Sequence, residues 1–387
     1  MLEKLNEYLK ELEKELWGMS DYLYHHPELG DQEVESMKLL SSYLEKHQFM
    51  VEKGIVGRKT AFKATFDSAL PGPTIAFLAE YDALPDIGHG CGHNMIGTMS
   101  VGAGVLLSKV AMELGGKVVV LGTPAEETNG AKVDMASNGI FDDIDVAMMV
   151  HPADQSYQSG DSLAMDAIQF NFTGKSSHAA ASPEEGINAL DAVIHLFNGI
   201  ATLRQHVPSD VRMHGIIKEG GIAANIIPEK ASAQFYLRAK DRSTLNGIRK
   251  KVELIASGAA AMTGANIETH PYELSYDNMK TNKTLSALFT KNLLTSGVKK
   301  VHPAKSSTGS IDMGNVSHVI PAIHPYIGLD APGLIAHTRE FADRTITPVG
   351  HAVLSQGVFT LAKTAADILG NEILLQEIKE EFIQSNV

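Results

Sequence analysis

TIAFLAEYD, at residues 74–82, is the stretch of sequence that decides the fold. Its first six residues form a short, uninterrupted apolar run, which is typical of a buried strand, and two carboxylates follow directly. Similar runs lie at residues 117–121 and 145–150, and the small-residue-rich segment 97–114 fits a helix packed tightly on a sheet. Strands that alternate with helices predict an α/β fold with a central, mostly parallel sheet flanked by helices.

A different order of elements is predicted for the middle of the chain. Strands are expected at residues 165–174, 211–218, 229–239 and 265–273, and helices at 182–207 and 242–262. The resulting order, β-α-β-β-α-β, is the split βαβ or ferredoxin-like pattern. The sequence therefore predicts a domain inserted at residues 165–275, with residues 1–164 and 276–387 forming the α/β domain.

The composition is that of a globular protein. Of 387 residues, 44% are hydrophobic and 20% are charged, which excludes a disordered chain. The formal net charge of −13 argues against a nucleic-acid partner, because an acidic surface repels phosphate. No apolar run approaches the roughly 20 residues of a membrane span, and the first residues lack the apolar core of a signal peptide. With a single cysteine and no intrachain disulfide, we expect a cytoplasmic protein that has no membrane partner.

The glycine-rich loop GHGCGHN, at residues 88–94, holds the first candidate metal ligands. Alternate glycines allow a tight loop to approach an ion closely. Cys91 and His93 are two residues apart, so in extended backbone their side chains leave on the same side. A thiolate and an imidazole together suit Zn²⁺ and other late first-row metals. Taken alone, the pair fits a buried cysteine beside a solvent-facing histidine equally well.

Polar side chains follow three of the predicted strands. Asp82 follows the first, Glu126 and Glu127 follow the second, and His151 follows the third. The carboxyl ends of parallel strands meet at one edge of the sheet, where α/β folds place ligands. Two adjacent carboxylates repel each other unless a cation is near, so one can bind a metal while the other serves as a general base. Asp82 could orient a histidine ligand, although each residue taken singly also fits a turn or a solvated loop.

Further candidates lie in the inserted domain and in the C-terminal part of the chain. His178 occupies a flexible loop, Asn225 precedes a strand, and Arg238 is a natural clamp for a carboxylate. Ser310, in the small polar loop 309–314, could hold a substrate carboxylate through its hydroxyl, and His337 is a candidate ligand. The plain alternatives are surface histidines, a turn asparagine and a surface arginine.

Assembled in order, these residues resemble the aminoacylase/carboxypeptidase G family of co-catalytic metallopeptidases. The resemblance covers nearly the whole chain and is closest to the amidohydrolase branch, with its indole-acetyl-amino-acid hydrolases, p-aminobenzoyl-glutamate hydrolases and dipeptidase-like enzymes. It is carried by HHPELG at 25–30, AEYDALP at 79–85, the Cys91/His93 loop, PAEE at 124–127, HP at 151–152, KSSH at 175–178, NIIP at 225–228 and the segment around His337. Two positions differ from many relatives: this chain has Asn94 where they have Asp, and Ile96 where they have His. A chain with Asn at the first position is similar to the dipeptidase-like and aminobenzoyl-glutamate-type sub-branch.

The resemblance implies a site for two divalent metal ions, Zn²⁺ or Mn²⁺. By position, Cys91 looks like the bridging ligand, with His93 and Glu127 on one side and His151 and His337 completing the pair. The inserted domain would be a lid and dimerisation domain, which implies a homodimer or homotetramer.

The resemblance also implies roles for the remaining candidates. Glu126 would be the general base, supported by Asp82 among the catalytic residues. His178 would reach the neighbouring subunit's active site and stabilise the oxyanion. Asn225 and Arg238 would bind the amide carbonyl and the substrate carboxylate, to which Ser310 is added as a substrate-binding residue.

We therefore expect a metal-dependent amidohydrolase or peptidase. Its substrates would be N-acyl amino acids, aminobenzoyl-glutamate-like conjugates or short peptides with a free carboxylate. Two alternatives stay open: a hydrolase with Cys91 as nucleophile, and a non-catalytic relative that binds a metabolite. A structural metal protein is disfavoured, because structural zinc sites are usually closed by four Cys or His ligands.

Overall fold

The computed structural model describes residues 1–305 and 309–385, which fold into two compact units. The first unit contains the described residues of 1–161, 279–307 and 312–387. The second contains residues 162–278 and the described residues of 308–311. The second unit is thus inserted into the sequence of the first.

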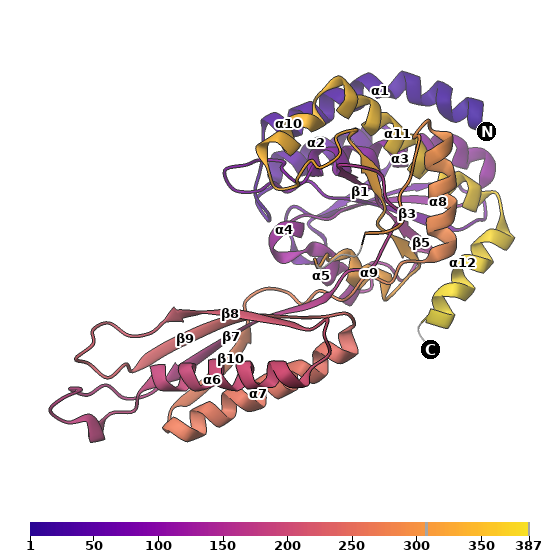
Figure 1. Cartoon of the computed structure of the whole chain (residues 1–387). Coiled ribbons are helices and arrows are strands. Elements are labelled where there is room, and N and C mark those ends of the chain that lie inside the picture. Colours follow the sequence, from indigo (N-terminus) through magenta and orange to yellow (C-terminus); the bar gives the residue numbers. More distant parts are fainter. Residues whose placement is uncertain (306–308, 386–387) are drawn as a thin grey trace. The chain divides into compact units, whose positions relative to one another are not determined.

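A six-stranded sheet lies at the centre of the first unit, with helices gathered around it (Figure 1). Its strands, in spatial order, are β1 (Met50–Lys53), β2 (Phe62–Asp67), β4 (Lys117–Gly122), β3 (Thr74–Ala79), β5 (Val146–Met148) and β11 (Ala322–Ile323). β4, β3, β5 and β11 are parallel, whereas β2 is antiparallel to both β1 and β4. The α/β fold is confirmed, but the sheet is mixed because β2 is antiparallel to its neighbours. β1 and β2 were not predicted from the sequence.

Helix α3 (His93–Leu114) packs on β3 and β4 and is covered by α1 (Leu2–His25) and α11 (Pro348–Leu369). Its small residues permit this close packing: a Cβ on Gly104 would lie 2.4 Å from Val120. By length and composition α3 could cross a membrane, which the sequence analysis did not anticipate, but 89% of its apolar window is buried. Such burial is typical of a core helix in a globular domain.

The other elements of the first unit complete its outer layers and a small second sheet. The helices are α2 (Val34–Lys46), α4 (Glu126–Asn129), α5 (Ala131–Ser137), α8 (Lys283–Thr295), α9 (Met313–Ser317), α10 (Arg339–Thr345) and α12 (Glu372–Ser385), with a short 3₁₀ turn at Ile55–Gly57. The second sheet pairs β6 (His151–Ala153) in parallel with β12 (Tyr326–Gly328).

The second unit is a four-stranded antiparallel sheet with two helices. The sheet order is β10 (Asn266–Pro271), β7 (Ala164–Thr173), β9 (Lys230–Ala239) and β8 (Arg212–Glu219). Helices α6 (Ala189–Leu203) and α7 (Arg242–Thr263) lie against one face (Figure 1), where they bury a core rich in Phe, Leu, Val and Ala. The predicted β-α-β-β-α-β order is confirmed.

The predicted start of the first helix of this unit is wrong. Pro183–Glu185 form only a 3₁₀ turn, and Ser182 makes no side-chain cap hydrogen bond. The turn ends at Gly186, whose backbone is extended. Helix α6 begins later because the Asn188 side chain accepts hydrogen bonds from the backbone N–H groups of Leu190 and Asp191.

Candidate functional site

The candidate site is built where three parallel strands end. β4, β3 and β5 are neighbours, so their carboxyl ends share one edge of the sheet. Asp82 follows β3, Glu126 and Glu127 open α4 after β4, and His151 opens β6 after β5. This edge is the ligand-binding position expected of an α/β sheet.

All five predicted metal ligands lie within this cluster. Three groups of side-chain ligand atoms have all their members within 4.8 Å of one another: Cys91 with His93 and His151, Cys91 with Glu127 and His337, and His93 with Glu126 and Glu127. The Cys91 sulfur lies 3.5 Å from Nε2 of His151 and 3.5 Å from Nε2 of His337. Cys91 thus belongs to two groups, one with His93 and His151 and one with Glu127 and His337, while the third group places His93 with Glu127. The groups overlap, so they bring the five ligands together without assigning each ligand to one ion.

Asp82 holds two members of the cluster, His93 and Glu127, in position. Its Oδ1 lies 2.9 Å from Nδ1 of His93, and its Oδ2 accepts a 2.9 Å hydrogen bond from the backbone N–H of Glu127. His93 is fully buried, and its Nε2 has no hydrogen-bond partner among the described residues. A carboxylate on one imidazole nitrogen orients the other nitrogen, which is how proteins commonly hold a metal-binding histidine.

The donor set fits divalent metal ions. Besides Nε2 of His93, the buried Oε1 of Glu127 lacks a hydrogen-bond partner among the described residues. Buried polar atoms are costly to leave unbonded, so two of them that face one cluster indicate a missing partner. Thiolate, imidazole and carboxylate donors together suit Zn²⁺, Mn²⁺ and similar ions.

Cys91 is poorly suited to act as a nucleophile. Burial, followed by the negative charge of Glu127, raises the pKa of the Cys91 thiol. Nucleophilic cysteines need the opposite, a pKa lowered by positive surroundings. In these surroundings the thiolate needs a bound cation to form, and a thiol that coordinates a metal ion is deprotonated outright. The cluster therefore favours the ligand interpretation of Cys91 over the cysteine hydrolase alternative.

A buried carboxylate holds the turn before Glu126. Ala125 has a positive φ of 64°, and its backbone N–H donates a 2.9 Å hydrogen bond to the carboxylate of Glu33, which is fully buried. Burial, then the carboxylates of Glu80 and Glu127, raises the pKa of Glu126 well above its ordinary value. A base with a raised pKa holds a proton more readily near neutral pH, as general acid–base catalysis requires.

Replacing Glu33 with Gln is expected to remove a pH-dependent loss of stability. Burial raises the pKa of Glu33 from 4.5 to about 7 in the folded chain. The folded chain therefore binds this proton more tightly, so the penalty is absent below pH 4.5 and complete above pH 7. Between pH 5 and pH 8 the free energy of unfolding of the variant should rise by about 2 to 3 kcal/mol relative to wild type. Urea unfolding of the metal-free proteins measures this, and an equal difference at both pH values would contradict it.

A buried ion network behind the cluster was missed by the sequence analysis. Nζ of Lys132 lies 2.7 Å from Oε1 of Glu80 and 2.7 Å from Oδ1 of Asp312. All three side chains are buried. Lys132 lies in α5 and belongs to no recognisable motif, so nothing in the neighbouring sequence indicated that it is a buried cation.

The predicted residues of the second unit form two separate pairs. His178 and Asn225 lie in exposed neighbouring loops, where the backbone N–H of Ala179 donates to the carbonyl of Asn225. Arg238 donates a 3.1 Å hydrogen bond to the hydroxyl of Ser310, so this predicted pair is brought together.

The two pairs lie at opposite ends of the sheet of the second unit. β9 pairs with β7 from Lys230 to Ala239, with Arg238 close to one end and the His178 and Asn225 loops beyond the other. The eight steps from Lys230 to Arg238 span about 26 Å at about 3.3 Å per residue. One small substrate cannot contact both pairs of the same chain.

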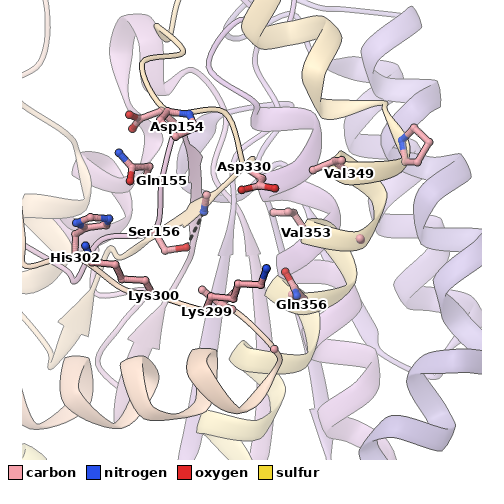
Figure 2. A pocket seen from close by; sticks show the side chains of 16 residues that line it. Asp154, Gln155, Ser156, Lys299, Lys300, His302, Asp330, Val349, Val353 and Gln356 are labelled. Carbon is pink, nitrogen blue, oxygen red and sulfur yellow. Dashed lines mark hydrogen bonds between the residues drawn. The ribbon is translucent and has the colours of Figure 1, made fainter.

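A cavity of about 550 Å³ lies in the first unit apart from the cluster (Figure 2). It is lined by Asp154 and Ser156 after β6, by Lys299 and Lys300 after α8, and by residues of α11. None of the predicted site residues lines it. It is therefore separate from the candidate metal centre.

Comparison with known proteins gives one consistent result. Residues 165–262 match the family model described as a peptidase dimerisation domain. The chain is 35% identical to the Xaa-Arg dipeptidase of Mus musculus, over 97% of this chain and 90% of that protein. It is 27% identical to a subunit of the p-aminobenzoyl-glutamate hydrolase of Escherichia coli (strain K12), over 95% and 91% of the two chains. It shares its fold with the YXEP protein of Bacillus subtilis, described as a dinuclear metal-binding peptidase from the M20 family (TM-score 0.66, 22% identity, 93% and 99% coverage).

Proposed function

This chain belongs to the M20 family of metallopeptidases and amidohydrolases, and from that premise we propose that it hydrolyses dipeptides with a free C-terminal carboxylate. The reaction class, metal-dependent hydrolysis of an amide bond, is that of the family. The single observation that carries the proposal is the set of ligand atoms centred on Cys91. We place the enzyme in the cytoplasm, where a single free cysteine that serves as a ligand stays reduced.

Two divalent ions, Zn²⁺ or Mn²⁺, would be held by Cys91, His93, Glu127, His151 and His337. Such ions supply Lewis-acid chemistry, which lowers the pKa of water towards neutrality and polarises a carbonyl. Asp82 keeps Nε2 of His93 directed at the cluster.

Glu126 carries the proton in the proposed reaction. Its carboxylate takes a proton from the attacking water and returns it to the leaving amine. His178 of a second subunit donates to the oxyanion that forms on the carbonyl, and Asn225 binds the amide beside it. Arg238 and Ser310 clamp the substrate carboxylate.

The distance between the His178 and Asn225 pair and the Arg238 and Ser310 pair supports a homodimer or homotetramer. Because His178 and Arg238 of one chain are too far apart for one small substrate, a second copy supplies one pair. Strand β8 is an edge strand of the sheet and exposes Ile216 and Ile217, 60% and 46% of whose surfaces are accessible. An exposed apolar edge strand is a ready surface for pairing with another chain.

Replacing Ile216 with Glu on this edge is expected to dissociate the oligomer and to reduce turnover. A charge on the edge strand opposes pairing between copies, and separated chains cannot share His178. Light scattering and steady-state kinetics measure the two effects. Ile373→Glu is the matched control, because Ile373 is an even more exposed isoleucine, at 73%, on α12 of the first unit. A dimeric Ile216→Glu variant with wild-type activity would contradict the assignment.

A substrate panel tests the proposed specificity. We expect dipeptides that end in Arg or Lys to give the highest kcat/KM, because one relative is named an Xaa-Arg dipeptidase and this chain carries a net charge of −13. The panel also contains neutral and acidic dipeptides, aminobenzoyl-glutamate and N-acetyl amino acids. Preference for aminobenzoyl-glutamate or for N-acetyl amino acids would change the proposed substrate class from dipeptides to that class. If the metal-loaded protein hydrolysed no member of the panel, the proposal would be overturned.

A further inference from the structure

The buried ion network behind the cluster contains more negative than positive charge. Lys132 is a single ammonium with a carboxylate 2.7 Å away on each side, Glu80 and Asp312. All three groups are shielded from water, with exposures of 0% for Lys132, 1% for Glu80 and 0% for Asp312. Buried charges are stable only when they are matched by partners. One further positive charge is therefore expected next to this network.

The two oxygens of Glu80 have different surroundings. Oε1 accepts a hydrogen bond from the ammonium of Lys132. Oε2 is buried and has no hydrogen-bond partner among the described residues. Oε2 lies 3.5 Å from Nε2 of His93, which also lacks a hydrogen bond among those residues. Two unbonded polar atoms thus face each other in a water-excluded space.

The 3.5 Å between Oε2 of Glu80 and Nε2 of His93 fits two ligands of one cation better than a direct hydrogen bond between them. A charge-assisted hydrogen bond between imidazolium and carboxylate is about 2.7 to 2.9 Å long. Two ligands bound to one zinc ion at about 2.1 Å, with a tetrahedral angle between them, are about 3.4 Å apart. The observed separation of Oε2 and Nε2 matches the second arrangement.

We infer that Glu80 is an additional ligand of the metal centre, and that its Oε2 binds the ion held by His93. The inference rests on the proposed two-metal function and adds a sixth protein ligand to it. Lys132 occupies Oε1, so Glu80 binds through one oxygen only. The ion in turn supplies the further positive charge that the network of Lys132, Glu80 and Asp312 lacks.

The first test is the binding of Co²⁺ alone to Glu80→Gln, followed by visible absorption. Gln keeps the shape and can still accept from Lys132, but it presents an amide where the carboxylate oxygen was. We expect one of two Co²⁺ equivalents to bind about 100-fold more weakly or worse, since even residues that only support a ligand cost about 10- to 100-fold. The absorption bands of that ion should also shift.

Two controls separate the possible failures. Asp154→Asn removes a carboxylate 2.9 Å from Lys305 in the same unit but outside the cluster, and it should leave Co²⁺ binding unchanged. Wild-type protein that binds no Co²⁺ would overturn the proposed function itself. Wild type with two ions and Glu80→Gln with the same two affinities and spectrum would overturn only the role of Glu80.

A second measurement does not depend on the folding of the variant. In a crystal structure of the wild-type chain loaded with Zn²⁺, we expect Oε2 of Glu80 within about 2.2 Å of an ion. An ion bound by His93 with Oε2 more than about 3 Å away would overturn the inference.

Discussion

Glu126→Gln is expected to lower kcat by about 10²- to 10⁴-fold while the protein keeps its metal ions, the range that general acid–base catalysis typically contributes. Gln matches the size of Glu but cannot accept a proton. In the structure Oε2 of Glu126 lies 3.9 Å from Nε2 of His93, at the margin of the cluster. Burial and the nearby carboxylates of Glu80, Glu127 and Asp312 raise the pKa of Glu126, which suits a group that takes up a proton and releases it within one turnover.

The neighbouring residue provides the matched control for this experiment. Glu127→Gln makes the same chemical change one position further along, but it removes a predicted ligand that lies 3.3 Å from Nε2 of His337. We expect this variant to lose metal affinity as well as activity. If Glu126→Gln lost its metal, or kept wild-type kcat, the assignment of Glu126 as the base would be wrong.

Cys91→Ala is expected to empty the metal centre and to abolish hydrolysis. Its sulfur is the one ligand atom common to the group with His151 and the group with Glu127 and His337. Removing a ligand shared by two ions weakens both, whereas removing any other ligand weakens one. Metal analysis after dialysis should therefore find fewer bound ions in Cys91→Ala than in His151→Ala.

Cys91→Asp distinguishes the ligand role from nucleophilic attack. A carboxylate can bridge two ions as a thiolate does, so we expect part of the metal content and of the activity to return. A cysteine nucleophile would not be rescued by Asp, and its loss would leave the metal content unchanged. Retained metal together with lost activity in Cys91→Ala would support the cysteine hydrolase alternative.

Much of the cluster was predictable because parallel strands bring distant residues to one edge. The runs at 74–79, 117–121 and 145–150 predict strands, and Glu126, Glu127 and His151 follow two of them in sequence. The structure places these residues together with Cys91 and His337. His337 follows none of these strands, and its sequence context fitted a ligand and a surface histidine equally well. Its place in the ligand set came from the family resemblance.

What escaped prediction depends on contacts between elements. β1 and β2 were missed because their antiparallel pairing lies at the edge of the sheet, where neither strand is wholly apolar. The helix cap at Asn188 was missed because Ser182 followed by Pro183 is a typical helix start, which led to the predicted start at residue 182. Lys132 could not be recognised as a buried cation, since its partners Glu80 and Asp312 are 52 and 180 residues away.

The metal content of the wild-type protein, measured together with its hydrolysis of an Arg-terminated dipeptide before and after chelation, tests the central claim most directly. We expect about two divalent ions per chain, loss of activity as they are removed, and recovery when Zn²⁺ or Mn²⁺ is returned. Protein that binds no metal after reconstitution, or whose activity is indifferent to the chelator, would contradict the two-metal mechanism.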